Sequence, residues 1–315
     1  MTAAERSALT RRDDRADVAI DVSGLRKSYG EVRAVDDISF AVHRGEIFGL
    51  LGPNGAGKTT TLECLEGLRS VDGGQIDVLG IDPTTQPRRL NGKIGVQLQA
   101  SGLPATMTCD DAMRFFCAYH HVEPKWDLLD SFGLSAHRTT TYDELSTGLQ
   151  RRLALALAIA HEPEVLILDE PTAGLDVASR SELHRLIREL SDHGTTVLLA
   201  THDMAEAERM TDRVAILLRG RIVATGSPRE LTATGEGLTK ISVRSQNGTV
   251  LSGIDFPTVS QSSVADDYAV LFTADIAATV TSVIDALDHA NDPLIDLRVE
   301  RPSLEERFLE LTSSP

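Results

Sequence analysis

Short apolar runs alternate with segments of helical periodicity through most of the chain. Apolar runs of this kind are typical of strands buried on both faces, and the periodic segments between them are typical of helices that cover a sheet. Strands are expected at residues 47–51, 75–79, 93–99, 165–170, 196–200, 214–218 and 221–225. Helices are expected at residues 60–68, 149–161, 178–190 and 204–210. Strand and helix alternating in this order predict an α/β fold with a mainly parallel sheet.

Two further patterns extend this core. Residues 18–21 and 38–42 predict short strands of a β-rich N-terminal subdomain. At about residues 100–160 the pattern changes character, with helices expected at 110–121 and 125–132. We interpret this region as an inserted helical subdomain.

The two ends of the chain differ from the core. Residues 1–16 are polar and of mixed charge, which is typical of a disordered tail. Residues 17–230 form the main predicted domain, and residues 238–315 predict a small α+β C-terminal domain without a recognisable chemical motif. The strands expected in the small domain are 239–244, 268–273 and 295–299, and its helices are 274–289 and 303–311.

Charge and cysteine usage narrow the classes of function. The chain has 31 Lys and Arg residues against 47 Asp and Glu residues, a net charge of −16. This balance argues against a nucleic-acid partner, because phosphate backbones are bound through basic surface. Cys64, Cys109 and Cys117 have neither metal-ligand spacing nor even pairing, so we expect small buried thiols in a reducing, cytosolic setting.

No apolar run is long enough to span a membrane. The longest runs, such as residues 153–160, fall well short of the ~18–20 residues that a bilayer helix needs. The N-terminus also lacks the apolar core of a signal peptide. If the protein works at a membrane, we expect another chain to supply the membrane-spanning part.

A glycine-rich segment between an expected strand and an expected helix carries the first chemical signal. It reads Gly-Pro-Asn-Gly-Ala-Gly-Lys-Thr-Thr over residues 52–60, and in this context it matches a phosphate-binding P-loop. The glycines let backbone N–H groups turn toward phosphate oxygens, while Lys58 reaches the β- and γ-phosphates and the Thr59 hydroxyl ligates Mg²⁺. We therefore predict that the chain binds a nucleoside triphosphate. The contacts are assigned to Gly52, Pro53, Asn54, Gly55, Ala56, Gly57, Lys58, Thr59 and Thr60.

A pair of carboxylates gives the second signal. Asp169 and Glu170 follow four apolar residues at the end of an expected strand, where α/β sheets place their ligands. This position suits Asp169 for holding Mg²⁺ and Glu170 for orienting or deprotonating the attacking water.

Two aromatic features are less specific. Tyr29, upstream of the P-loop, fits two interpretations equally well: stacking on adenine, or packing in the core of a strand. His120 and His121 are adjacent rather than at i, i+4, so we expect a solvated helix end rather than a metal site.

The stretch Leu-Ser-Thr-Gly-Leu-Gln at residues 145–150 is the third chemical signal, and it indicates a protein family. It resembles the signature motif of ATP-binding cassette (ABC) ATPases, and the other motifs of that family follow in the correct order between about residues 18 and 230. The matching positions are Gln99 in the Q-loop, 169–172 at the end of Walker B, 173–176 in the D-loop and His202 in the switch.

The signature departs from the family's usual Leu-Ser-Gly-Gly-Gln. Thr147 and Leu149 occupy its third and fifth positions, whereas Ser146 and Gly148 are retained. The extra side chain of Thr147 lies where the backbone approaches the nucleotide, so we expect slower turnover or a slightly altered dimer. Ser146 is also a good N-cap for the helix that follows.

The resemblance implies a P-loop NTPase (ABC ATPase) core over residues 17–230 with ATP and Mg²⁺ as its ligands. It implies catalytic roles for Glu170, which polarises the water, for His202, which contacts the γ-phosphate, and for Lys58 and Gln99. The Mg²⁺ ligands that it implies are Thr59, Gln99 and Asp169.

The resemblance also implies partners. Two copies of such a cassette clamp head to tail, so we expect a homodimer in which Ser146 and Gly148 contact the ATP held by the other copy, while Tyr29 stacks on adenine. The helical subdomain would receive an integral-membrane permease. The implied location is cytoplasmic, peripheral on the inner face of the cell membrane.

The end of the chain points to one branch of the family. Residues 301–312, Arg-Pro-Ser-Leu-Glu-Glu-Arg-Phe-Leu-Glu-Leu-Thr, resemble the tail of the drug-, antibiotic- and polyketide-exporter branch of the daunorubicin-resistance type. The implied function is an ATPase subunit that powers export of a drug-like, antibiotic-like or lipidic compound through a separate permease. The alternative is a soluble ABC ATPase acting in DNA repair or on the ribosome. The sequence shows neither the coiled coil or zinc insertion usual in the repair proteins nor the second cassette usual in the ribosomal ones.

Overall fold

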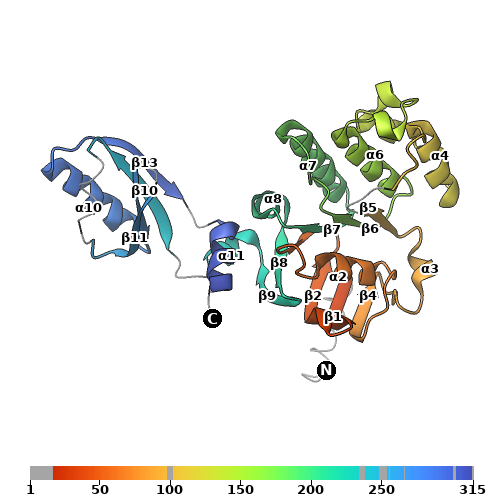
Figure 1. The fold of residues 1–315 in the computed structure, drawn as a ribbon, viewed down its shortest axis with the longest axis horizontal. Coiled ribbons are helices and arrows are strands. Elements are labelled where there is room, and N and C mark those ends of the chain that lie inside the picture. The colour runs from red at the N-terminus through yellow and green to blue at the C-terminus, as the bar shows by residue number, and fades with distance from the viewer. Residues whose placement is uncertain are drawn as a thin grey trace, which may run out of the picture. The chain divides into compact units, whose positions relative to one another are not determined.

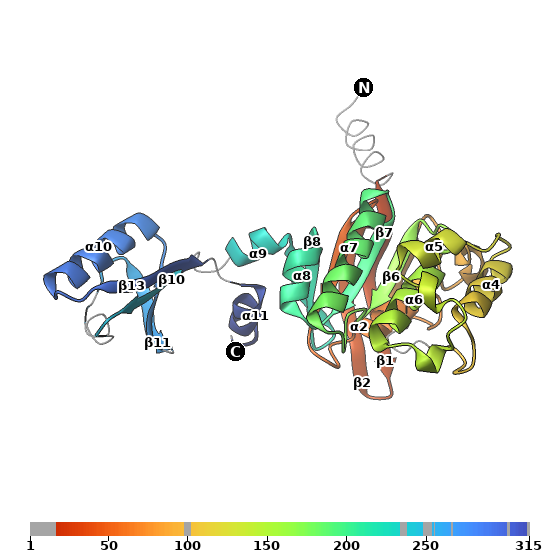
Figure 2. The same ribbon diagram turned by 90° about the horizontal axis from the view of Figure 1, so that it is seen from above.

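The computed structural model describes residues 17–97, 102–233, 238–247, 254, 256–265, 267–300 and 303–313. The predicted tail at 1–16 and the predicted Q-loop residue Gln99 lie outside these residues. The chain separates into two compact units, Met1–Thr225 and Gly226–Pro315, and each is described by itself (Figures 1 and 2).

The first unit is built on a six-stranded sheet in the order β5-β6-β7-β3-β8-β9, with the strand that precedes the P-loop in its interior. Neighbours from β5 to β8 run parallel. This confirms the predicted parallel sheet. The bounds are β3 Ile47–Leu51, β5 Ile94–Gln97, β6 Val165–Asp169, β7 Thr196–Thr201, β8 Arg213–Leu218 and β9 Arg221–Gly226.

A smaller antiparallel sheet, in the order β2-β1-β4, belongs to the same unit. Its strands are β1 Val18–Tyr29, β2 Val32–His43 and β4 Gly73–Val78. The short strands predicted at 18–21 and 38–42 are parts of strands of 12 residues each. Polar positions interrupt their apolar pattern, because an antiparallel sheet can leave one face in water.

The helices of this unit cover the sheets. Helix α2 begins at Lys58, inside the glycine-rich motif, rather than at the predicted residue 60. Ser146 caps α6, since its side chain accepts a hydrogen bond from the Leu149 amide at 3.3 Å; this confirms the predicted cap. The bounds are α2 Lys58–Leu65, α3 Pro87–Leu90, α4 Cys109–Tyr119, α5 Trp126–Ser131, α6 Thr147–Ile159, α7 Val177–Asp192 and α8 Met204–Met210.

Two apolar cores lie on opposite faces of the six-stranded sheet. Along β3, Phe48 and Leu50 face a core shared with α2 and the β2-β1-β4 sheet. Ile47 faces a second core shared with α4, α5, α6 and α7. Figure 1 shows this layering, with α6 and α7 on one side of β6 and β7 and α2 on the other. The six-stranded sheet is therefore packed on both of its faces.

The second unit is a four-stranded antiparallel sheet, β11-β12-β10-β13, with α10 packed on it (Figure 2). Val283 and Leu287 of α10 lie in one apolar core with Ile241, Val243 and Leu271 of the sheet. The bounds are α9 Pro228–Ala233, β10 Thr239–Ser245, β11 Val259–Ala265, β12 Tyr268–Thr273, α10 Ile276–His289, β13 Leu294–Glu300 and α11 Leu304–Ser313.

In the described part of the chain, none of the helices combines the length and the apolar character required to cross a bilayer. His120, at the end of α4, stacks on His161 with ring centroids 3.8 Å apart, so the predicted solvated helix end is wrong for His120. Cys64, Cys109 and Cys117 are buried free thiols, as predicted. Burial raises the pKa of the Cys64 thiol to about 11, so this side chain stays protonated and packs as an apolar group.

Candidate active site

The loop after β3 is shaped by glycines that no other residue can replace. A Cβ on Gly52 would lie 2.2 Å from the Leu217 carbonyl oxygen, and one on Gly57 would lie 2.3 Å from the Ala34 carbonyl oxygen. Gly57 also has φ = +107°, in the region that favours glycine. The loop therefore leads directly into the N-terminus of α2, where free backbone N–H groups favour an anion.

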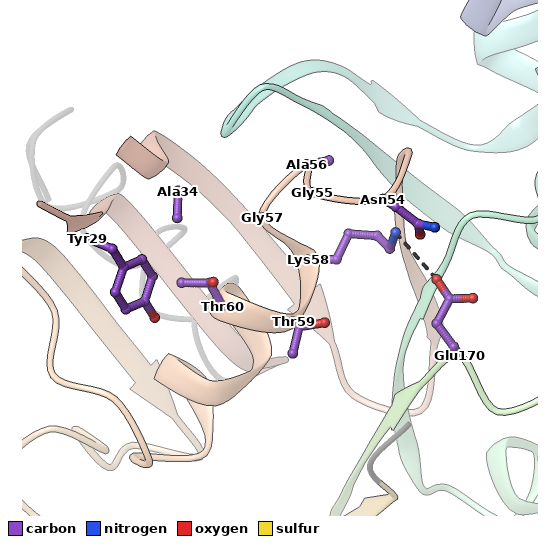
Figure 3. Close-up of a pocket in the computed structure, with 10 residues that line it drawn as sticks. All are labelled: Tyr29, Ala34, Asn54, Gly55, Ala56, Gly57, Lys58, Thr59, Thr60 and Glu170. Carbon is purple, nitrogen blue, oxygen red and sulfur yellow. Dashed lines mark ion pairs between the residues drawn. The ribbon is translucent and has the colours of Figure 1, made fainter. Parts of the chain in front are cut away.

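A pocket of about 510 Å³ opens at this loop. Figure 3 shows Tyr29 at one end of it and Glu170 at the other, with the P-loop between them. Its lining consists of Tyr29, Ala34, Asn54, Gly55, Ala56, Gly57, Lys58, Thr59, Thr60 and Glu170. The volume falls in the range of ~300–1,000 Å³ typical of small-molecule sites, and the phosphate-binding loop forms one wall.

Lys58 places a buried cation at the pocket. Only 6% of its surface is exposed, and its Nζ donates hydrogen bonds to the carbonyl oxygens of Gly52, at 2.7 Å, and Pro53, at 3.3 Å. The same Nζ lies 3.4 Å from Glu170 Oε1, the ion pair marked in Figure 3. An incoming phosphate group would compete with Glu170 for this ammonium group.

Thr59 and Asp169 form the oxygen-rich part of the site. Thr59 Oγ1 donates to Asp169 Oδ2 at 2.9 Å, while the buried Asp169 Oδ1 has no hydrogen-bond partner among the described residues. Burial raises the pKa of Asp169, against the lowering effect of the Thr59 hydrogen bond. A buried, incompletely paired carboxylate beside a hydroxyl fits a hard cation such as Mg²⁺.

Glu170 is held in an unusual backbone conformation. Its φ is +50°, which is strained for a residue with a side chain, and its amide donates to the Ala200 carbonyl oxygen at 2.9 Å. The carboxylate is buried, and His202 Nδ1 lies 2.7 Å from Glu170 Oε2. The structure thus brings together Lys58, Glu170 and His202, as well as the Thr59–Asp169 pair.

Glu206 of α8 holds two segments of the site in place, and the sequence analysis did not predict this role. Its side chain is 1% exposed and accepts hydrogen bonds from Thr172, at 2.6 Å, and Thr201, at 2.6 Å, with His184 Nε2 at 2.9 Å. Burial pushes its pKa upward, but these hydrogen bonds prevail and leave the pKa lowered. Because Thr172 follows the Glu170 turn and Thr201 precedes His202, this carboxylate ties both segments together. The sequence feature that could have identified Glu206 is an acidic residue on the buried face of the helix predicted at 204–210.

Replacing Glu206 with glutamine tests this positioning role. The amide nitrogen of glutamine cannot accept a hydrogen bond, so one of the three donors loses its partner and the segments bearing Glu170 and His202 shift. We expect kcat for ATP hydrolysis to fall roughly ten- to hundredfold, since small misplacements have effects of this size, with little change in the dissociation constant for ATP. Steady-state kinetics and calorimetry measure the two quantities. Glu208→Gln, an exposed substitution on the same helix, is the matched control, and an equal fall in that variant would refute the role.

Tyr29 lies at the end of β1 with 42% of its surface exposed. The interpretation that Tyr29 packs in the core of a strand is therefore wrong. Lys27 Nζ and Arg69 Cζ each lie 5.7 Å from the ring centroid, and the ring borders the pocket. Its position leaves stacking on adenine as the remaining prediction.

The signature residues do not line this pocket in the described part of the chain. Ser146 and Gly148 lie at the start of α6, where a Cβ on Gly148 would meet Ser179 Oγ of α7 at 2.8 Å. Gly52 and Pro53 also do not line it, although their carbonyl oxygens hold Lys58. One copy of the chain therefore brings together the P-loop and Walker B residues without the signature.

The loop, the buried lysine and the paired carboxylates define a P-loop nucleoside triphosphatase. The ABC transporter family model matches residues 35–173. The chain is 35% identical over 305 residues to the daunorubicin resistance ATP-binding protein DrrA3 of Streptomyces coeruleorubidus, covering 94% of this chain and 96% of that protein. It is 36% identical over 301 residues to the Nod factor export ATP-binding protein I of Rhizobium johnstonii, covering 94% and 95%. The chain therefore belongs to the family of ABC transporter ATP-binding proteins, and it is an ATPase.

Solved structures agree on the fold. A structure of the ATP-binding subunit of an ABC transporter matches with a TM-score of 0.63 at 28% identity, covering 68% of this chain and 91% of that chain. A dimeric ATP-binding cassette in a post-hydrolysis state with ADP and Pi matches with a TM-score of 0.61 at 23% identity, covering 66% and 98%. These likenesses confirm the predicted P-loop NTPase fold.

Proposed function

We propose that this chain is the ATPase subunit of an ABC exporter, which hydrolyses MgATP to drive export of a drug-like, antibiotic-like or lipidic compound through a separate membrane permease. The observation that carries the proposal is the cluster of Lys58, Glu170 and His202 around the P-loop pocket. Relatives named for daunorubicin resistance and Nod factor export, aligned over 94% of this chain, support an exporter.

ATP binding follows from the charge and shape of the pocket. The phosphates lie along the loop at the start of α2 and attract Lys58 Nζ away from Glu170, while the adenine lies against the exposed Tyr29 ring. Release of the Lys58–Glu170 pair leaves Glu170 Oε1 available to a water molecule. Nucleotide binding thereby frees Glu170 to act as the general base.

Hydrolysis uses the freed carboxylate. Glu170 takes a proton from the attacking water, whose oxygen bonds to the γ-phosphorus as the bond to the β–γ bridging oxygen breaks. His202, 2.7 Å from Glu170 Oε2, orients the carboxylate and contacts the γ-phosphate. Thr59 and Asp169, together with the predicted ligand Gln99, would hold Mg²⁺. When bound, this ion neutralises phosphate charge.

A head-to-tail homodimer completes the site in this proposal. Ser146 and Gly148 lie at the capped N-terminus of α6, which attracts anions, yet they do not line their own chain's pocket among the described residues. A second copy would bring them to the γ-phosphate. The proposed location is cytoplasmic, with the chain bound to the permease at the inner face of the membrane.

Co-expression tests the exporter assignment. The chain is expressed alone and together with the protein of the neighbouring reading frame, and membranes are separated by sedimentation. We expect the chain to sediment with membranes only when a neighbour with about six transmembrane helices is present. A chain that stays in the soluble fraction and whose ATPase activity rises with DNA or ribosomes would favour the alternative function instead.

A further inference from the structure

The tyrosine at one end of the nucleotide pocket lies at the tip of a hairpin (Figure 3). Tyr29 is the last residue of β1, and its pairing with Val32 is the last pair of the hairpin formed by β1 and β2. Tyr29 is 42% exposed, so packing in an apolar core does not fix the orientation of its ring. A ring that stacks on a ligand binds it more tightly when it is already held in the bound orientation, because ordering a side chain on binding costs affinity.

Two cations contact this ring from outside the pocket. Lys27 Nζ and Arg69 Cζ each lie 5.7 Å from the ring centroid, within the ~6 Å over which a cation is attracted to an aromatic face. In the described part of the chain, Tyr29 lines the nucleotide pocket and neither cation does. The part of the ring that borders the pocket therefore stays open to a ligand.

Arg69 is itself fixed by a carboxylate of the P-loop helix. Its Nε and Nη2 donate to Glu63 Oε2 and Oε1 at 2.8 and 3.2 Å, and its amide donates to the Glu63 carbonyl oxygen at 3.1 Å. A two-pronged pair of this kind fixes the orientation of the guanidinium plane as well as its position. Glu63 belongs to α2, which begins at the P-loop. The same helix thus carries the phosphate-binding loop at its start and, through Glu63 and Arg69, supports Tyr29 near its end.

Asp72 holds the backbone that leads to Tyr29. The Ser28 amide donates to Asp72 Oδ2 at 2.6 Å, and Lys27 Nζ donates to Asp72 Oδ1 at 3.2 Å. The Asp72 amide donates in turn to the Arg26 carbonyl oxygen at 2.9 Å. The end of β1 is therefore tied to the segment that follows α2, and the cations act on a ring whose backbone is already in place.

We propose that Arg69 is a positioning residue for nucleotide binding: paired with Glu63, it holds the Tyr29 ring in the orientation that stacks on the adenine base. Arginine suits this role better than Lys27, because its planar guanidinium group stacks on an aromatic face and is fixed by a carboxylate at two points. Arg69 does not line the pocket among the described residues, so it acts on ATP through Tyr29. The inference rests on the adenine stacking of Tyr29 in the proposed function.

The affinities for two ligands separate this role from a general effect of charge. MgATP carries the base, whereas inorganic triphosphate with Mg²⁺ carries phosphates alone. The ratio of their dissociation constants, measured by calorimetry, is the base preference. Arg69→Ala should lower the base preference roughly two- to fivefold, the effect of one exposed cation–π contact. Arg44→Ala, which removes an equal charge from another exposed ion pair, should leave it unchanged. An unchanged base preference in Arg69→Ala would overturn the proposal.

Two further variants test whether Arg69 acts through its neighbours. Glu63→Gln releases Arg69 from its fixed orientation and should lower the base preference as Arg69→Ala does. In a Tyr29→Ala background, Arg69→Ala should lower it no further, because the ring through which it acts is gone. A base preference that rises in Glu63→Gln, or that falls again in the double variant, would mean that Arg69 contacts the nucleotide directly and would refute the positioning role.

Steady-state kinetics distinguish this role from damage to the fold. Arg69→Ala should raise KM for MgATP two- to fivefold at nearly constant kcat, because it weakens binding of the ground state and the transition state alike. A fall in kcat at unchanged KM would contradict the proposal.

The stacking of Tyr29 and its support by Arg69 can fail separately. If Tyr29→Ala keeps the base preference of wild type, the adenine contact in the proposed function is wrong, and the role of Arg69 is refuted with it. If Tyr29→Ala loses the preference and Arg69→Ala keeps it, the role of Arg69 alone is refuted.

Discussion

Glu170→Gln is expected to bind MgATP with close to wild-type affinity and to hydrolyse it at least ~100-fold more slowly, the usual effect of removing a general base. The glutamine side chain keeps the size of the carboxylate but cannot take the proton from water. It can still lie beside His202, which is 2.7 Å from Glu170 Oε2 in the native protein. Phosphate release measures turnover, and calorimetry measures affinity.

The control for this experiment is the exposed variant Glu208→Gln, which changes the net charge equally and should keep full turnover. Because Lys58 no longer pairs with an anion in Glu170→Gln, nucleotide affinity should stay equal to that of wild type or rise slightly. A variant that retained most of the wild-type turnover would remove Glu170 from the role of base.

Lys58→Ala is expected to weaken ATP binding by roughly 10- to 100-fold, which corresponds to the ~1.5–3 kcal/mol of a hydrogen bond to a charged group. The variant loses the buried cation that the structure holds 2.7 Å from the Gly52 carbonyl oxygen and 3.4 Å from Glu170. The phosphates would then face Glu170 without a compensating charge. Calorimetry with ATP measures the loss.

Lys93→Ala is the matched control, because Lys93 pairs with Glu164 on the surface and does not line the nucleotide pocket. It should bind ATP as wild type does. Unchanged affinity in Lys58→Ala would contradict the assignment of residues 52–60 as the phosphate-binding loop.

The core of the fold could be predicted because its strands are buried on both faces. The runs in β3, β6 and β7 are apolar at nearly every position, and all of their residues are buried. The half-exposed strands β1 and β2 carry charged residues at their solvent-facing positions. The apolar pattern therefore predicted only part of each strand. Strand β11, with Gln261, Ser262 and Ser263 in its interior, gave no apolar pattern at all and was missed.

The site residues also divide into those that a local sequence pattern predicts and those that it does not. Lys58, Asp169 and Glu170 were recognisable because each lies in a short motif at or just after the end of a buried strand, and the structure brings them together. Glu206 was not, because its function depends on contacts with Thr172 and Thr201 that only the tertiary fold creates. Glu66 was hidden for a related reason, since nothing in the local sequence shows that this carboxylate, just after α2, is buried and has no hydrogen-bond partner among the described residues.

In the proposed function, two copies of this chain enclose ATP, and each supplies Ser146 and Gly148 to the other's P-loop. It is tested most directly by the molar mass of Glu170→Gln in light scattering, with and without MgATP. We expect a monomer without nucleotide and a dimer with MgATP. We also expect a return to monomer when Ser146→Arg, which blocks the capped N-terminus of α6, is added. A Glu170→Gln protein that binds MgATP and stays monomeric, alone and with its permease, would contradict it.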